Sequence, residues 1–128
     1  MNILHLNQNQ FSDTINIYNN VYKPLIKFPN EKELMDILLK KKFKGKYFPF
    51  PIFFGITKNN YSKLRSKKKI SFYYKKKYFM HVEDVSFYKI DKNKFGKTLF
   101  GENYPNHPFF LKFNKYYAFM NFKVKKIY

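Results

Sequence analysis

The stretch Tyr47-Phe-Pro-Phe-Pro-Ile-Phe-Phe-Gly-Ile56 is the longest interior run without a charged residue, in a chain of which 27% is charged. An uncharged aromatic run bounded by turn-forming residues is typical of a strand that is buried on both faces. Because Pro49 and Pro51 have no backbone N–H to donate, we expect regular strand pairing to begin only at about Ile52. The stretch therefore predicts a small β-rich domain with residues 52–56 near its centre.

Length and composition predict one domain with a single core. The chain has 128 residues and a mass of 15.8 kDa, and we expect residues 1–10 to form an irregular N-terminal arm. A hydrophobic content of 45%, with 23% aromatic residues, is enough to fill a core, so a disordered chain is not expected. The absence of cysteine excludes a disulfide scaffold, a thiolate metal site and a thiol nucleophile.

The N-terminal segment does not have the pattern of a signal peptide. Residues 1–12 lack both the basic start and the apolar centre that such a peptide requires. No apolar run approaches the roughly 18 residues of a membrane span. We therefore expect a cytoplasmic protein without a membrane partner.

The formal net charge of +18 comes almost entirely from lysine, because Arg65 is the only arginine. Six residue types with A/T-rich codons (Phe, Tyr, Met, Ile, Asn and Lys) make up 82 of the 128 residues, a composition typical of an A/T-rich genome. Proteins that read bases favour the guanidinium fork of arginine, so sequence-specific nucleic-acid recognition is not expected. Diffuse attraction to RNA, DNA or anionic lipid is expected.

The clearest helix signal begins at Asn30. This residue can cap a helix, and Glu33 three residues later completes the spacing of a capping box. Lysines Lys40, Lys41 and Lys42 in the last turn match the helix dipole. An apolar stripe predicts core packing, with a partner-binding groove as the alternative reading; it consists of Leu34, Ile37, Leu38 and Met35.

Other elements are predicted by helix-capping residues and by the alternation of apolar and polar side chains along strands. We expect a short helix or turn over residues 13–21, a helix from Thr57 to about Ser66, and a helix from Asp91 to Phe100 that ends at Gly101. Strands are expected over residues 70–74 and 78–82, joined by a turn at Lys75, Lys76 and Lys77, and over residues 115–127 as a half-buried closing strand.

Residue patterns that carry chemistry are few. His5, His81 and His107 lack metal-ligand spacing, and the adjacent pair Glu83-Asp84 would point to opposite faces of a strand. The tripeptide Gly96-Lys97-Thr98 is similar to the end of a phosphate-binding loop, but Asp91 occupies the position that needs a glycine. We therefore expect no metal, no cofactor and no catalytic residues on this chain.

One segment has a pattern that points to a particular protein family: Phe100-Gly-Glu-Asn-Tyr-Pro-Asn-His-Pro108. Together with a terminal alternating strand, it resembles the N-terminal PUA-like domain of ATP sulfurylase (sulfate adenylyltransferase). The resemblance covers about residues 11–128. Its other parts are Pro24–Phe28, Phe48–Ile56, Tyr73–Val82 and Glu83–Tyr88. Departures from the family pattern include Lys27 and Glu102-Asn103.

The resemblance implies an α+β fold, a PUA-like β pseudo-barrel of mixed short strands with three or four short flanking helices. The active-site motifs of a sulfurylase lie in its following nucleotidyltransferase domain, and none of them occurs in this sequence. The resemblance thus implies a non-catalytic domain with a structural or assembly role. Its expected partner is a separate nucleotidyltransferase domain or a second copy of the chain.

Two sets of candidate contact residues follow. Asn103 and His107 either approach a substrate or partner at a domain junction or form a structural corner, and the second reading is favoured. A free-standing RNA-binding module is the alternative function, because other PUA folds bind RNA. In that case one basic surface is expected, with Tyr73 available for stacking; its lysines are Lys40, Lys41, Lys42, Lys67, Lys68, Lys69, Lys75, Lys76 and Lys77.

Overall fold

The computed structural model describes residues 2–124, and it is built from five α-helices, one 3-10 turn and nine short strands. The helices are α1 (Gln8–Tyr18), α2 (Glu31–Lys40), α3 (Lys58–Leu64), α4 (Lys92–Phe100) and α5 (Pro108–Asn114), with the 3-10 turn η1 at Tyr104–Asn106. The strands are β1 (Ile3–His5), β2 (Lys27–Phe28), β3 (Lys42–Phe43), β4 (Lys46–Tyr47), β5 (Gly55–Ile56), β6 (Ile70–Tyr74), β7 (Lys77–Val82), β8 (Ser86–Tyr88) and β9 (Ala118–Lys123).

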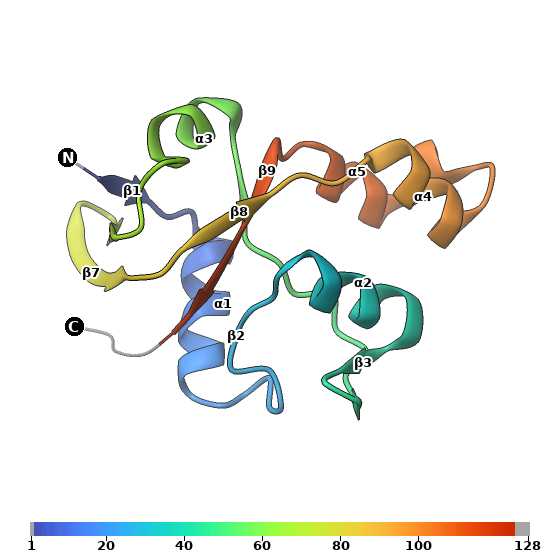
Figure 1. The fold of residues 1–128 in the computed structure, drawn as a ribbon, viewed down its shortest axis with the longest axis horizontal. Coiled ribbons are helices and arrows are strands. Elements are labelled where there is room, and N and C mark those ends of the chain that lie inside the picture. The colour runs from blue at the N-terminus through green and yellow to red at the C-terminus, as the bar shows by residue number, and fades with distance from the viewer. Residues whose placement is uncertain (1, 125–128) are drawn as a thin grey trace.

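The strands form three separate sheets. Strand β6 lies between β1, which runs parallel to it, and β7, which follows through an antiparallel hairpin. Strand β9 pairs with β2, β5 and β8, while β3 and β4 make a small hairpin of their own. In Figure 1, β9 crosses the middle of the molecule, with α4 and α5 on one side and β1 and β7 on the other. Within residues 2–124 the sheets do not close into a barrel, so the predicted pseudo-barrel is not confirmed.

The aromatic stretch at residues 47–56 is central to packing, but most of it is not a strand. Only Gly55–Ile56 pairs regularly, as β5 against β9. Residues 48–54 lie outside helices and strands, and the N–H of Ile52 bonds locally to the carbonyl of Phe50 (2.9 Å) instead of to a neighbouring strand. The predicted strand over residues 52–56 is therefore too long, because Ile52 bonds back to Phe50 and only Gly55–Ile56 pairs with β9.

Residues 3–5 and 8–10 belong to β1 and α1, so the predicted irregular arm over residues 1–10 is wrong for these residues; Met1 lies outside the described part of the chain. Strand β1 pairs with β6 in the register Ile3–Ser71 to His5–Tyr73. Asn7 then caps α1, with Gln10 returning the bond to the backbone of Asn7. This capping box satisfies two N–H groups at the start of the helix. With α1 and α5, the helices number five, more than the three or four predicted.

Several predicted elements are confirmed, and all of them are defined by local signals. Asn30, Thr57 and Asp91 cap α2, α3 and α4 through their side chains, as their positions indicated. Strands β6 and β7 form the predicted hairpin, in which Lys75 and Lys76 have positive φ values of 49° and 67°. Two consecutive positive φ values are those of a type I′ turn.

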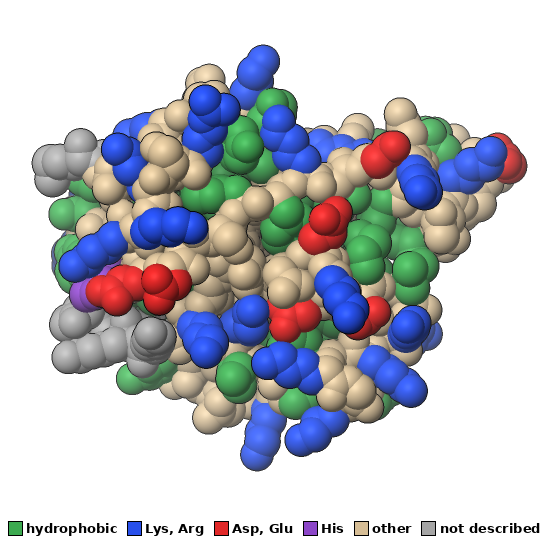
Figure 2. All heavy atoms as spheres, viewed as in Figure 1, with side chains coloured by type: hydrophobic (Ala, Val, Ile, Leu, Met, Phe, Trp, Pro, Cys, Tyr) green, Lys and Arg blue, Asp and Glu red, His purple; other side chains and the backbone are tan. Residues whose placement is uncertain are grey.

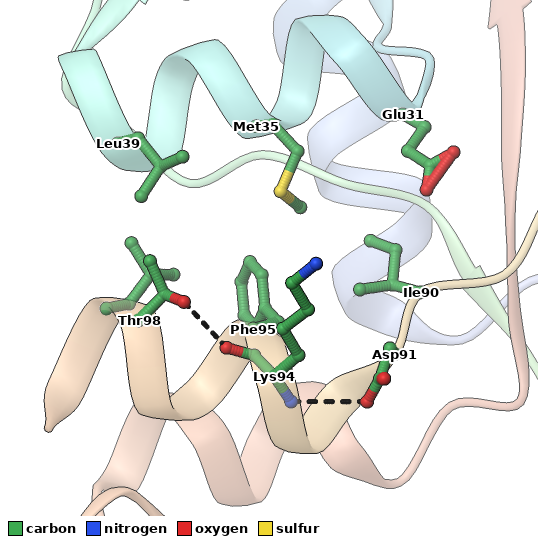
Figure 3. A pocket seen from close by; sticks show the side chains of 9 residues that line it. Glu31, Met35, Leu39, Ile90, Asp91, Lys94, Phe95 and Thr98 are labelled. Atoms are coloured by element: carbon green, nitrogen blue, oxygen red, sulfur yellow. Dashed lines mark hydrogen bonds between the residues drawn. The ribbon is translucent and has the colours of Figure 1, made fainter. Parts of the chain in front are cut away.

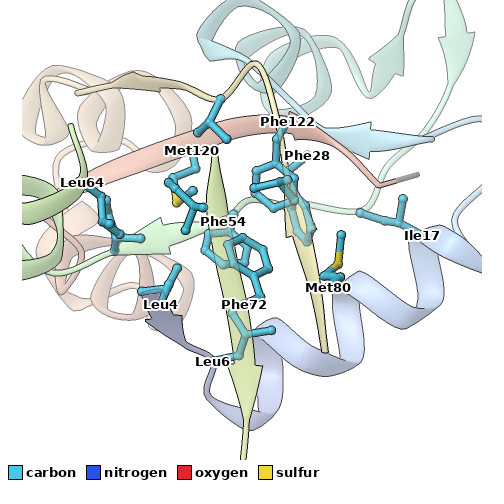
Figure 4. Close-up of a cluster of buried hydrophobic side chains, with 14 of the residues drawn as sticks. Leu4, Leu6, Ile17, Phe28, Phe54, Leu64, Phe72, Met80, Met120 and Phe122 are labelled. Carbon is cyan, nitrogen blue, oxygen red and sulfur yellow. The ribbon is translucent and has the colours of Figure 1, made fainter. Parts of the chain in front are cut away.

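The buried side chains form two clusters separated by β9. The larger cluster contains Phe28, Phe54, Phe72 and Phe122, and Figure 4 shows these rings meeting in its middle. The smaller one lies under α2, α4 and α5 and consists of Leu34, Phe95, Phe113 and Phe119. Ala118 and Met120 belong to the larger cluster and Phe119 to the smaller. The first half of β9 is therefore buried on both faces, whereas a half-buried strand was predicted.

Candidate functional site

An apolar groove lies between α2 and α4. Its volume is about 370 Å³, and Figure 3 shows Met35 and Leu39 of α2 facing Phe95 and Thr98 of α4 across it. Helix α2 buries Leu34 and Ile37 in the core, so Met35 and Leu39 form a second, outward stripe on the same helix. The volume of this groove lies near the lower end of the range of about 300–1,000 Å³ found for ligand pockets.

Polar groups stand at the rim of this groove. Glu31, Asp91, Lys94 and Thr98 line it beside the apolar residues. The Asp91 carboxylate accepts a bond from the Lys94 N–H (3.2 Å), and the Thr98 hydroxyl donates to the Lys94 carbonyl (2.8 Å), as drawn in Figure 3. These bonds hold the rim groups to the backbone of α4. The groove can accept apolar side chains in its middle, and its rim carries two carboxylates, Glu31 and Asp91, beside the ammonium group of Lys94.

The apolar surface continues past the end of α4. A second hollow of about 290 Å³ shares Leu99 with the groove. It is lined further by Ile37, Leu38, Lys41, Pro49, Pro51, Phe100 and Phe109. The two hollows together, which we call the α2–α4 surface, give one side of the molecule a continuous apolar area.

His107 forms a structural corner beside the α2–α4 surface. Its Nδ1 accepts a bond from the N–H of Phe109 (3.1 Å), which caps α5, and its ring stacks on Phe100 at a centroid distance of 3.9 Å. Asn103 precedes η1, is exposed, and makes no side-chain bond to the backbone of that turn. A substrate or partner contact by Asn103 or His107 stays a prediction.

Replacing His107 with alanine is expected to lower the free energy of unfolding by about 1 kcal/mol, the usual worth of a helix cap. The measurement is urea denaturation followed by circular dichroism. His107→Asn is the matched variant, because asparagine can cap the helix but cannot stack on Phe100. If the two variants lose the same free energy of unfolding, His107 stabilises the protein through its ring contact with Phe100 and not through the helix cap.

The lysines predicted to form one basic surface lie in separate places. Lys40–Lys42 are at the end of α2 and the start of β3, Lys67–Lys69 lie between α3 and β6, and Lys75–Lys77 are in the β6–β7 hairpin. Figure 1 places β3 and β7 on opposite sides of the molecule. Figure 2 shows lysines spread over the whole visible face, with acidic residues among them. The first and last clusters therefore do not belong to one surface.

Tyr73 lies in a row of rings that crosses the β1–β6–β7 sheet. His5 and Tyr78 are its register partners on the two neighbouring strands. The ring centroids of His5 and Tyr78 are each 5.8 Å from that of Tyr73. Because side chains alternate along a strand, Tyr73 is on the face opposite the fully buried Phe72. His5 and Tyr78 were not among the predicted contact residues, since a parallel pairing between distant segments leaves no local sequence signal.

Three buried or partly buried polar groups bond within the protein. The Tyr88 hydroxyl donates to the Pro29 carbonyl (2.9 Å), and burial raises the pKa of this phenol, with Glu31 and Glu33 adding to the effect. Burial also raises the pKa of the Asp13 carboxyl, which accepts a bond from Tyr22. Desolvation lowers the pKa of the Lys92 ammonium, which donates to the carbonyls of Asn114 and Tyr116. These bonds tie separate elements together.

Metal ligands do not gather in the described part of the chain. Among residues 2–124 no three His, Asp or Glu side chains lie close enough to hold a metal ion. The pair Glu83-Asp84 follows β7, where Glu83 contacts Lys69 (3.9 Å) and His81 (3.7 Å). The helices described in this range are also too short or too polar to cross a membrane.

The structure is a mixed α+β domain with an apolar groove between α2 and α4 and a row of rings on the β1–β6–β7 sheet. The sequence model of the PUA-like domain family matches residues 1–120. This chain belongs to the PUA-like domain family. No curated protein matched the sequence.

Proposed function

We propose that this PUA-like domain is a non-catalytic assembly module of the sulfate adenylyltransferase type, which docks a separate nucleotidyltransferase domain through the α2–α4 surface. The observation that carries the proposal is the apolar groove of about 370 Å³ between two helices. Large exposed apolar areas with polar rims mark protein–protein contacts. Leu39, in the groove, keeps 52% of its side chain exposed and would lose that exposure in a complex.

The segment that resembles the sulfurylase family supports the choice of partner. Phe100 opens this segment and Phe109 follows it, and both line the second hollow of the α2–α4 surface. His107 holds the two together by stacking on Phe100 and bonding to the N–H of Phe109. The family-like segment therefore shapes the same surface that is proposed to dock the partner. Glu31 at the rim favours a partner segment with a basic residue beside its apolar side chains.

Docking is tested with the nucleotidyltransferase domain of a sulfate adenylyltransferase, expressed without its own N-terminal domain. We expect Leu39→Glu to weaken binding at least tenfold in isothermal titration calorimetry, because the complex would bury an unpaired charge. Ile26→Glu is the matched control, since Ile26 is 51% exposed and does not line the groove. Equal affinities of the two variants would contradict the proposed interface. A dimer of the chain that Leu39→Glu abolishes would assign the surface to self-association instead.

A non-catalytic role also predicts that the chain alone does not convert ATP and sulfate to products. Purified protein with ATP, sulfate and pyrophosphatase is expected to release no phosphate above the rate without protein. The physical reason is the single arginine, which provides no cationic clamp for a sulfate and a triphosphate. Turnover that His107→Ala abolishes would overturn the assignment.

RNA binding is a second candidate function, and one observation favours it. Tyr73 lies beside two further rings on one face of a sheet, and its strand β6 runs directly into the lysine-rich turn at Lys75–Lys77. Stacking rings combined with lysines are the usual elements of a surface that binds RNA.

A further inference from the structure

We infer that the outer face of the β1–β6–β7 sheet binds single-stranded nucleic acid, whose bases stack on His5, Tyr73 and Tyr78. This inference rests on RNA binding as the second candidate function and names the form of nucleic acid and the residues that hold it. It does not involve the α2–α4 surface, which lies on the other side of β9 (Figure 1).

The ring row forms a platform of three aromatic side chains on one face of the sheet. Its three rings come from three adjacent strands and are spaced at 5.8 Å from one to the next, with planes inclined by 52° between His5 and Tyr73 and by 76° between Tyr73 and Tyr78. A base would therefore stack on one ring face and contact the neighbouring ring at its edge. His5 is exposed and Tyr78 keeps 41% of its surface exposed, while Tyr73 between them is half-buried. The Tyr78 hydroxyl is 2.8 Å from Nδ1 of His81, which fixes the outer ring in place. Rings held in fixed positions bind bases with a small loss of side-chain entropy.

The backing of the platform is rigid. Leu4, Phe72 and Met80 are the register neighbours of the row on the opposite face, and all three are buried in the larger core cluster. A bulge between Phe72 and Tyr73 brings Tyr78 opposite Tyr73, where regular pairing would have placed Phe79. The bulge therefore adds the third ring to the row, because it re-aims a side chain at this point of the sheet.

Charge favours a polyanion at one end of the row. Lys75 and Lys76 form the turn that follows β6, and Lys77 begins β7 next to Tyr78. At the other end of β6, Lys69 contacts Glu83 (3.9 Å), and this carboxylate offsets its charge. Lys77 pairs with Tyr74 and Lys75 lies over the Tyr74 ring (5.5 Å), so both lysines start from the face opposite Tyr73. The turn would therefore contact phosphates at the edge of the sheet, from which the strand of nucleic acid would run across the rings.

A single strand fits this surface better than a duplex. Bases in a single strand are free to leave their own stack and lie on protein rings, whereas the bases of a duplex are covered by their neighbours. A stacking platform also has no need of arginine for base readout, in agreement with a chain that has only Arg65.

The chain contains its own control in the β3–β4 hairpin. That hairpin carries Lys42, Lys44 and Lys46 beside Tyr47, which is 72% exposed. It has a similar density of lysine, lies on the opposite side of the molecule, and has no ring row. Diffuse attraction would use both hairpins equally.

The test is fluorescence anisotropy of the native chain with a labelled 12-nucleotide oligo(U) RNA at about 0.15 M salt, where weak phosphate contacts are screened. We expect a dissociation constant below about 1 μM, and a weaker one for a 12-base-pair RNA duplex. Tyr78→Leu and His5→Leu should each weaken binding at least fivefold, while Tyr47→Leu should change it less than twofold. Tyr78→Phe keeps the ring but loses the bond to His81, so it should bind more weakly than the native chain and more tightly than Tyr78→Leu.

The lysines are tested by the salt dependence of the same binding. Exchanging Lys75, Lys76 and Lys77 for glutamine should lower the slope of log K against log salt by about 2, and the same exchange at Lys42, Lys44 and Lys46 should leave it unchanged. Circular dichroism confirms that each variant is folded. If the dissociation constant is submicromolar but substitutions in the two hairpins weaken binding equally, the stacking site is wrong, whereas RNA binding as a function is retained. No binding at about 0.15 M salt would overturn both.

Discussion

Replacing Phe54 with alanine is expected to lower the free energy of unfolding by about 3–5 kcal/mol, the largest single effect in this protein. The side chain is 1% exposed. Its ring stacks on Phe72 of β6 at 5.5 Å and meets Phe28 of β2 and Phe122 of β9 edge-on at 5.1 and 5.2 Å. Phe54 therefore joins two sheets that share no strand, and its removal leaves a cavity between them.

Urea denaturation monitored by near-UV circular dichroism measures this effect. Phe50→Ala is the matched control in the same stretch, because Phe50 is 54% exposed and contacts only Phe48 and Tyr22 among the described rings. We expect that control to cost less than about 1 kcal/mol. Similar losses for the two variants would mean that the stretch contributes through its backbone and not through the ring of Phe54.

Gly55→Ala is expected to cost about 2–3 kcal/mol, because there is no space for a Cβ at this position. An added Cβ would lie 2.3 Å from Cγ of the Tyr116 ring. Tyr116 cannot easily give way, since its ring packs against Phe53 and Phe119 and its carbonyl accepts a bond from Lys92. The added methyl group would push the junction of α5 and β9 away from β5.

A double-mutant cycle identifies the cause of that loss. In a Tyr116→Ala background the clash is absent, so Gly55→Ala should then cost less than about 1 kcal/mol in the same denaturation measurement. If Gly55→Ala costs the same in both backgrounds, the glycine is required for a reason other than the approach of Tyr116.

Elements with local signals could be predicted from the sequence. Asn30, Thr57 and Asp91 each accept a bond from the N–H three residues on, so residue type and spacing alone locate the start of a helix. The same reasoning would have located α1, because Asn7 and Gln10 have the spacing of a capping box. The structural corner at His107 was predicted because Pro105 and Pro108 fix the backbone there, but helix α5, which His107 caps, was not predicted.

Elements that depend on distant segments could not be predicted. Strand β1 exists only because β6 lies beside it, and Leu4 pairs with Phe72, which lies 68 positions further along the chain. Residues 48–54 have the hydrophobicity of a strand, but their backbone bonds to other segments are isolated ones, from Phe48 to Lys41 and from Met120 to Phe54, and do not form a ladder. The groove likewise requires α2 and α4 to face each other, and a stripe such as Met35 and Leu39 does not reveal what it faces.

Hydrogen–deuterium exchange of the chain, with and without the nucleotidyltransferase domain, tests the assembly role most directly. Docking at the α2–α4 surface predicts slower amide exchange in residues 31–40 and 92–100 when the partner is added, with the β1–β6–β7 sheet unchanged. A complex that protects other segments and leaves both helices unaffected would contradict the proposed interface, and unchanged exchange throughout the chain would contradict the assembly role itself.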